Sequence, residues 1–105
     1  MALRFGWDDA KAAANKRKHR VSFEIAVRVF ADPFAFSEQG RIEGGEYRWR
    51  TIGSVEGVSV LLVAHTVHDR DVGIEPINII SARRADQSER LRYEKERYRH
   101  LRTGP

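Results

Sequence analysis

The stretch INIISARRADQSERLRYEKERYRHLR, residues 77–102, changes from a strand pattern to a helix pattern near its middle. β-branched and apolar residues dominate up to Ala82, and charged helix formers dominate after Asp86. Asp86 and Glu89 have the D-x-x-E spacing of a capping box, which predicts that a helix begins there. Arg83 and Arg84 therefore lie where a strand leads into a helix, and two adjacent guanidinium groups at that point raise the question of an anion site.

Three further strand patterns precede this one, over residues 34–38, 46–55 and 58–67. The run 58–67 is apolar on both faces, which predicts a central strand, whereas the short run 34–38 beside Pro33 predicts an edge strand. The polar, glycine-rich residues 39–45 predict a connection, and Glu56-Gly57 predicts a hairpin turn. The last strand is expected over 74–82. Hairpin-length connections predict an antiparallel sheet of four strands.

Two helices are expected before the sheet. Asp8 or Asp9 can cap the first helix, whose end is basic, and Ser22 can cap the second. The second helix has an apolar stripe at i, i+3, i+4 and i+7, formed by Phe23, Ala26, Val27 and Phe30. Asp32-Pro33 is expected to end it. The prediction is an α+β fold, one domain over residues 1–105, with two N-terminal helices and a C-terminal helix.

The charge of the chain is divided unevenly along its 105 residues. The net charge is +4 over residues 1–20, −4 over 21–82 and +4 over 83–105. Two basic ends on one side of the fold would suit a polyanion, although ordinary solvated helices explain the same pattern. The chain has no cysteine and no apolar run near the roughly 20 residues of a membrane helix, so we expect a cytoplasmic protein.

Three blocks of the sequence resemble the BrnT family, toxins of type II toxin–antitoxin systems with a compact RelE-like ribonuclease fold. The blocks are GWDDAKAAANKRKHRVSFEIAVRVFAD, EYRWRTIG and INIISARRADQSERLRYE. The resemblance implies an RNA endonuclease that halts translation. It also implies a BrnA-type antitoxin with a ribbon-helix-helix part, and contact with operator DNA only through the toxin–antitoxin complex.

One departure from the family pattern bears on activity. Family members often carry a basic residue where this chain has Asn78, and the preceding loop, VHDRDVGIEP, is longer than usual. A lower cation count on that strand would weaken RNA binding.

A metal-free ribonuclease needs a proton acceptor for the 2′-hydroxyl group and cations for the transition-state charge. Arg48 is the first candidate for that charge, since it projects from a mid-sheet strand; pairing with Glu46 or Glu75 is its structural alternative. Arg83 and Arg84 are candidates beside a helix N-terminus, and either could instead form a salt bridge with Asp86 or Glu89.

His65 and His19 are the candidates for proton transfer. His65 follows Leu61 and Val63 on one strand face, so a packed core histidine is the alternative. His19 ends a helix, where it could simply complement the helix dipole. The remaining RNA-binding candidates are helix-surface cations that ordinary solvation also explains: Lys16, Arg17, Lys18 and Arg90.

No cofactor is predicted, because glycine-rich nucleotide loops are absent. A metal site built from His65, His68, Asp69 and Asp71 has no closed-site spacing, so none is predicted. Two other functions remain open: a catalytically degenerate module that binds nucleic acid or protein, and a structural subunit that docks an acidic protein.

Overall fold

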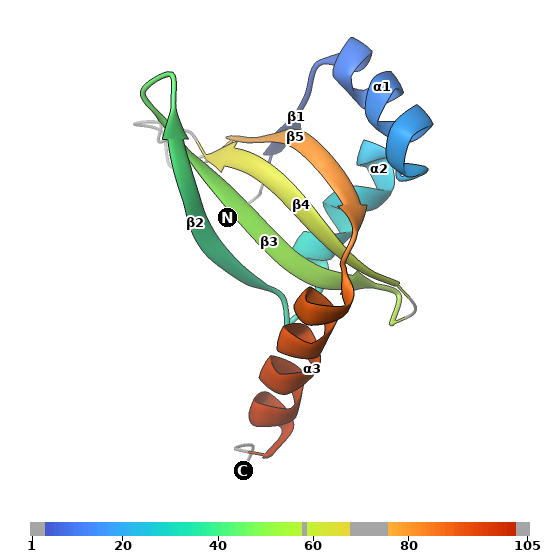
Figure 1. The fold of residues 1–105 in the computed structure, drawn as a ribbon, viewed down its shortest axis with the longest axis vertical. Coiled ribbons are helices and arrows are strands. Elements are labelled where there is room, and N and C mark those ends of the chain that lie inside the picture. Colours follow the sequence, from blue (N-terminus) through green and yellow to red (C-terminus); the bar gives the residue numbers. More distant parts are fainter. Residues whose placement is uncertain (1–3, 58, 68–75, 103–105) are drawn as a thin grey trace.

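The computed structural model describes residues 4–57, 59–67 and 76–102. Its elements are β1 (Arg4–Gly6), α1 (Asp9–His19), α2 (Phe23–Ala26), the 3₁₀ helix η1 (Val27–Ala31), β2 (Phe36–Glu43), β3 (Glu46–Val55), β4 (Ser59–Val67), β5 (Pro76–Arg84) and α3 (Gln87–Arg102). The strands form one sheet in the order β1-β5-β4-β3-β2 (Figure 1). The α+β class is confirmed, and the central position of β4 and the edge position of β2 are as predicted.

The sheet has five strands and is mixed, so the prediction of four antiparallel strands is wrong in detail. The extra strand, β1, has three residues and pairs in parallel with β5, placing Phe5 opposite Ile77. The sequence did not predict β1, because three residues are too few to show the alternation of a strand and because its partner β5 is distant in the sequence. The other neighbouring strands pair antiparallel, as expected.

The predicted connection over residues 39–45 is mostly strand. β2 continues to Glu43, and the turn is confined to Gly44 and Gly45, whose φ angles of 57° and 79° are left-handed. The register of β2 against β3 shifts between Gln39 and Ile42, an irregularity that accommodates the polar, glycine-containing stretch.

The second N-terminal helix is shorter than the apolar stripe predicted. It makes one α-turn and then continues as η1, so buried residues recur every three positions, at Phe23, Ala26 and Val29. Val29 thus occupies the core position predicted for Val27. Gly53 of β3 allows η1 to pack this closely, since a Cβ atom there would lie 2.9 Å from Val29 Cγ1.

The predicted caps are confirmed. Asp8 accepts hydrogen bonds from the amides of Ala10 and Lys11, and Ser22 accepts one from the amide of Ile25. At the start of α3, the Glu89 amide donates to Asp86 Oδ1 at 2.8 Å and the Asp86 amide donates to Glu89 Oε1 at 2.9 Å, a complete capping box.

The two faces of the sheet carry different layers. α1, α2 and η1 cover one face, where Phe23 and Val29 pack with Val63 and Ile79 in the main core. α3 crosses only one end of the other face, where Tyr93 packs on Ile52 and Leu62. In Figure 1, α3 leaves the sheet at one end of its strands and projects beyond that end. In the described part of the chain, no helix is long and apolar enough to cross a membrane.

Asn15 joins α1 to β5. Its side-chain amide donates to the carbonyls of Val21 and Ala82, at 3.0 Å and 2.8 Å, and accepts from the Ala82 amide at 3.1 Å. It is 7% exposed, so these bonds hold the start of the chain against β5 without access to water.

Candidate active site

Among the described residues, no helix covers the α3 side of the sheet at the end away from α3, and we call this part of the sheet the open face. Arg48 and Arg50 of β3 lie on it, because Trp49, between them, pairs with His65 on the opposite face. Two hollows are present here. The larger, about 810 Å³, is lined by residues that include Arg48, Arg50 and Ala64, within the roughly 300–1,000 Å³ typical of ligand pockets.

Arg48 lines both hollows, as do Lys11 and Ile80. Its Nε atom is buried and makes no hydrogen bond to any described residue. Glu43 Oε2 forms an ion pair with Arg48 but lies 3.6 Å from Nε, beyond hydrogen-bond distance. A buried donor without a partner is rare, and here it leaves Arg48 with hydrogen-bonding capacity for an anion.

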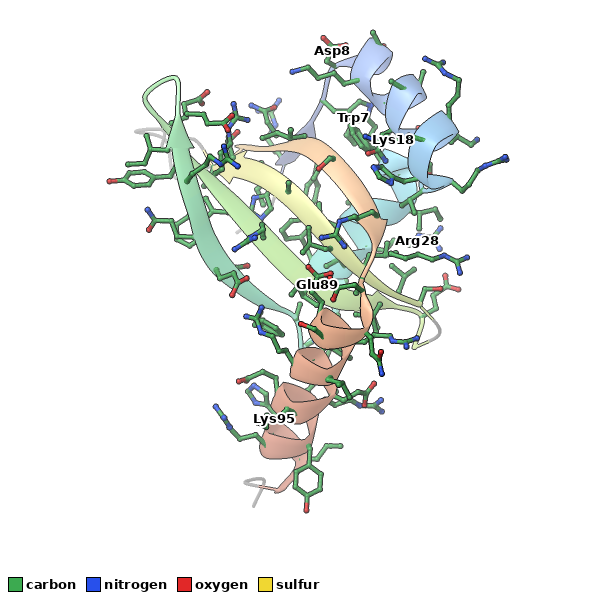
Figure 2. All side chains as sticks on the ribbon, viewed as in Figure 1. Trp7, Asp8, Lys18, Arg28, Glu89 and Lys95 are labelled. Carbon is green, nitrogen blue, oxygen red and sulfur yellow. The ribbon has the colours of Figure 1, made fainter. Side chains whose placement is uncertain are left out.

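Four segments of the chain meet at the smaller hollow, of about 330 Å³, among them β4 through Thr66. The N-terminal segment contributes Trp7, Asp8 and Lys11, β3 contributes Arg48, and β5 contributes Asn78. Figure 2 shows Trp7 and Asp8 where the chain enters α1, beyond the β5 side of the sheet. The β1–β5 pairing fixes this arrangement, because it places Gly6 opposite Asn78.

A chain of ion pairs separates the open face from α3. Glu38 of β2 lies between Arg50, whose Nη2 is 3.3 Å from Glu38 Oε1, and Arg92 of α3. The hydrogen bond from Arg92 lowers the pKa of Glu38 below its ordinary value, against the opposing effect of burial. Arg50 therefore contributes positive charge next to Arg48, although one carboxylate partly neutralises it.

Arg83 is held by Glu89 in a two-pronged ion pair, with Nη1–Oε1 at 2.8 Å and Nη2–Oε2 at 3.0 Å. The hydrogen bond to Glu89 raises the pKa of Arg83, and the same bond lowers the pKa of Glu89. Figure 2 shows Glu89 at the first turn of α3, in front of the sheet. Of the two readings predicted for Arg83, the geometry matches the salt bridge that joins β5 to the cap of α3.

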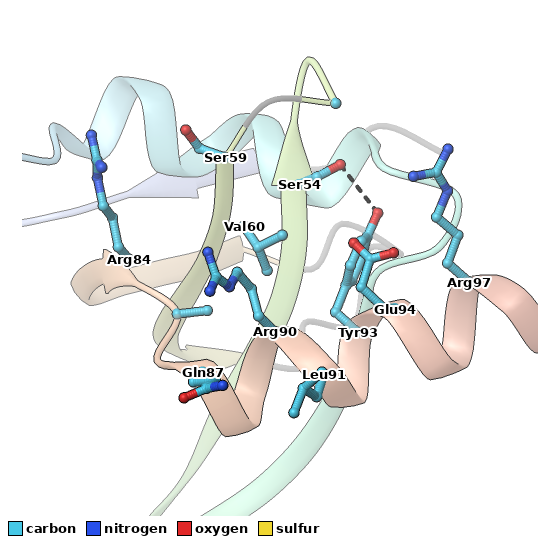
Figure 3. A pocket seen from close by; sticks show the side chains of 12 residues that line it. Ser54, Ser59, Val60, Arg84, Gln87, Arg90, Leu91, Tyr93, Glu94 and Arg97 are labelled. Atoms are coloured by element: carbon cyan, nitrogen blue, oxygen red, sulfur yellow. Dashed lines mark hydrogen bonds between the residues drawn. The ribbon is translucent and has the colours of Figure 1, made fainter.

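Arg84 points away from Arg83, because adjacent strand residues alternate between faces. It lines a cleft of about 460 Å³ between the β3–β4 hairpin and α3, together with Arg90 and Arg97 (Figure 3). It also borders a second groove with Lys16 and Arg20. Arg84 thus shares one cleft with Arg90 and another groove with Lys16, but none of these three residues lines the hollows around Arg48.

His65 is on the face covered by helices and is 3% exposed. Its Nε2 lies 2.7 Å from Thr51 Oγ1, and its ring stacks edge-on against Phe30 at 5.0 Å. Burial lowers the pKa of His65 to about 4. The sheet therefore lies between His65 and Arg48, and the structure gives the imidazole the environment of a core residue.

The α1 candidates are near its C-terminal end. His19 is half-buried, whereas Arg17 and Lys18 are exposed. These three residues do not line either hollow of the open face. The open face instead includes Lys11 and Arg50, which the site prediction omitted. The alternation of Arg48, Arg50 and Ile52 along one strand face was the available signal for Arg50.

No three histidine or acidic residues lie close enough to hold a metal ion within the ranges 4–57, 59–67 and 76–102. His68, Asp69 and Asp71, considered above as ligands with His65, lie outside the described residues.

A comparison with protein families matches residues 7–89 to the ribonuclease toxin BrnT of type II toxin–antitoxin systems. The chain belongs to the BrnT family. The matched BrnT region includes every residue that lines the two hollows of the open face and ends within the first turn of α3.

The fold is also similar to the 1.1 Å crystal structure of the Brucella abortus ribonuclease toxin BrnT, with a TM-score of 0.56 and 23% identity. The similarity covers 82% of this chain and 100% of that one. A search of curated proteins found no match.

Proposed function

We propose that this BrnT-family chain is a metal-independent RNA endonuclease that stops translation in the cytoplasm, with its active site on the open face. The unpartnered, buried Nε of Arg48 carries the proposal, because it is a permanently charged donor with unused hydrogen-bonding capacity on a side chain that lines both hollows. Lys11 and Arg50 add positive charge around the same hollows. Such a cluster suits the extra negative charge of a phosphorane-like transition state.

The reaction that fits these groups uses the nucleophile already present in RNA. The 2′-oxygen attacks the phosphorus and loses its proton to a carboxylate, for which Glu43 is the candidate because its Oε2 lies 3.6 Å from Arg48 Nε. The bond from phosphorus to the 5′-oxygen breaks, and that oxygen takes a proton from Lys11 or water. The products are a 2′,3′-cyclic phosphate and a 5′-hydroxyl. Glu43 replaces His65 and His19 in this role, because neither histidine lines the hollows.

Cleavage of a defined RNA in excess EDTA tests the metal-independent route. We expect unchanged cleavage, cyclic 3′ ends, and no cleavage of DNA or 2′-O-methyl RNA. Glu43→Gln should slow the reaction about a hundredfold or more, as loss of a general base does. Abolition by EDTA, or equal cutting of the 2′-O-methyl substrate, would overturn this mechanism and make His68, Asp69 and Asp71 the residues to test as metal ligands.

The partner in this proposal is an antitoxin of the BrnA type, with a ribbon-helix-helix part that carries the contact with operator DNA. The family membership and the basic ends of the chain support it. Expression of the native operon should yield a copurifying complex whose affinity falls with salt to the extent that arginines bind the partner. Elution of the chain free of any neighbour-encoded protein would contradict the partnership.

A catalytically degenerate module of the same fold is the second candidate. Asn78 lines the smaller hollow beside Arg48, at the position where the family often carries a cation. The lack of a positive charge at this position lowers the affinity for RNA phosphate groups and leaves the fold intact. Induced expression in a bacterium separates the two candidates, because only an active ribonuclease should arrest growth and degrade transcripts.

A further inference from the structure

α3 carries a solvent-exposed stripe with the spacing of a coiled-coil seam. The steps along it alternate between four and three residues, and its members are Gln87, Leu91, Glu94, Tyr98 and Leu101. Its three large apolar side chains are more than 60% exposed: 63% for Leu91, 62% for Tyr98 and 64% for Leu101. The spacing averages 3.5 residues, which keeps a stripe facing a straight partner helix over two heptads.

The stripe has no packing role within the described residues. α3 is anchored from its other side, through Tyr93, which is 2% exposed and donates a hydrogen bond to Asp32 at 2.6 Å. Arg97 lies over the Phe34 ring, with Cζ 5.7 Å from its centroid, and adds to the contact on that side. Figure 1 shows the second half of α3 projecting past the sheet. Exposed apolar side chains in a row on a projecting helix are typical of a binding surface.

The residues beside the stripe are basic. Arg90 and Arg97 directly precede Leu91 and Tyr98, at the flanking positions that form ion pairs across a coiled coil. Lys95 occupies the flank on the other side, on the exposed surface of α3 in Figure 2. Figure 3 shows Arg90 and Arg97 on α3 and Arg84 on β5, before the helix begins; all three line the adjoining cleft, so the positive charge extends into it.

We propose that this stripe binds an amphipathic α-helix of the antitoxin, with apolar residues at heptad spacing and Asp or Glu at the flanking positions. The inference rests on the proposed function for the existence of that antitoxin. The basic flanks select an acidic partner. They also disfavour a second copy of this chain, because Arg90, Lys95 and Arg97 would meet like charges in either helix orientation.

RNA suits this surface less well than a helix does. Leu91 and Leu101 offer nothing to phosphates and no ring for base stacking, and Glu94 lies within the stripe. The cations of the open face are not on α3: Lys11 belongs to α1, and Arg48 and Arg50 belong to β3. RNA therefore has a better site away from the stripe. Most of the stripe also lies beyond residues 7–89, the part matched by the family.

Binding of the full chain to the purified antitoxin encoded beside its gene tests the proposal. The triple variant Leu91→Ala, Tyr98→Ala, Leu101→Ala removes the apolar contacts, and the double variant Arg90→Glu, Arg97→Glu reverses the flank. Each should raise the Kd at least tenfold, and the second should also remove part of the salt dependence. Arg4→Glu with Arg28→Glu is the control, since it makes the same charge change on β1 and η1 and should leave the Kd unchanged.

RNA cleavage and oligomeric state are measured on the same proteins. The triple variant should cleave RNA like the unmodified chain, which separates this inference from the active-site proposal. Wild-type antitoxin affinity in both variants would overturn the inference, as would a complete lack of antitoxin binding by the unmodified chain. Loss of RNA cleavage in the triple variant with antitoxin affinity intact would instead assign the stripe to RNA. If the unmodified chain forms dimers and the triple variant does not, while antitoxin affinity is intact, the stripe would be assigned to self-association.

Discussion

Arg48 is the residue on which the active-site proposal depends most directly. Replacing it with alanine removes the charge and the fork of donors from both hollows. We expect Arg48→Ala to lower the cleavage rate by about two orders of magnitude or more, the effect of losing a donor to a transition-state oxyanion. Arg48→Lys should recover only part of the rate, because a point charge does not reproduce the fork. Single-turnover cleavage of a defined RNA measures both.

The control for Arg48 is Arg28→Ala. Arg28 is also an arginine in a surface ion pair, with Glu56 at 2.5 Å, but it belongs to η1 on the other side of the sheet. Arg28→Ala should cleave RNA like the unmodified chain, and all three variants should keep its melting temperature. Equal activity of Arg48→Ala and Arg28→Ala would remove Arg48 from the active site.

Arg83 presents a different problem, because both of its Nη atoms already bind Glu89. If the pair is structural, Arg83→Ala and Glu89→Ala should each destabilise the fold. The double variant should be little worse than Glu89→Ala alone, which also loses the capping hydrogen bond from the Asp86 amide. A double-mutant cycle, measured by urea denaturation, should give a coupling energy on the order of 1 kcal/mol. The value is small because Arg83 is partly exposed. Arg84→Ala should leave stability unchanged. Additive effects, or a loss of cleavage at unchanged stability, would favour a role in catalysis.

At the scale of elements, the attachment of α3 depends on one buried tyrosine. Tyr93 donates to Asp32 Oδ2 at 2.6 Å and lies 3.1 Å from Ser54 Oγ. Burial would raise the pKa of Asp32, but hydrogen bonds from the Ser54 amide, Tyr93 and the Phe34 amide together lower it. Tyr93→Phe should therefore cost about 1–2 kcal/mol, measured by urea denaturation. Tyr98→Phe, which also loses one hydroxyl group but on the exposed side of α3, should cost nothing measurable.

The elements that the sequence predicts well are those with local signals. Asp8, Ser22 and the Asp86–Glu89 pair begin their helices as expected, because a cap depends on bonds spanning only two or three residues. β1 was missed because its three residues become a strand only through pairing with β5, more than 70 residues away. The extension of β2 to Glu43 likewise depends on its partner β3.

At the scale of the whole molecule, the candidate site depends on which face each residue occupies. Alternation within one strand correctly put Arg48 and Arg50 on the same face. It could not relate them to His65, because that requires the register of β3 against β4, in which Trp49 rather than Arg48 is opposite His65. Lys11 reaches the open face only through the docking of α1 beside β5, which no local pattern encodes.

The buried histidine links the stability of the whole fold to pH. Burial lowers the pKa of His65 to about 4, whereas an unfolded chain has a histidine pKa near 6.5. The unfolded state therefore binds more protons between these values, so the contribution of neutral His65 is present above about pH 6.5 and is lost as the pH falls toward 4. The full loss is on the order of 3 kcal/mol.

The measurement is the free energy of unfolding of the unmodified chain and of His65→Leu at pH 7 and pH 5. The variant keeps an apolar side chain in the core but cannot titrate, so its stability should fall less between the two pH values. Subtracting the change measured for the variant from that of the unmodified chain cancels the contributions of the other histidines. Asp32, Glu38 and Glu89 contribute little to the pH dependence, because their lowered pKa values move their loss of stability to more acidic solution. Parallel stability curves would mean that His65 binds a proton as readily in the folded protein as in the unfolded chain, and a proton-transfer role would then have to be reconsidered.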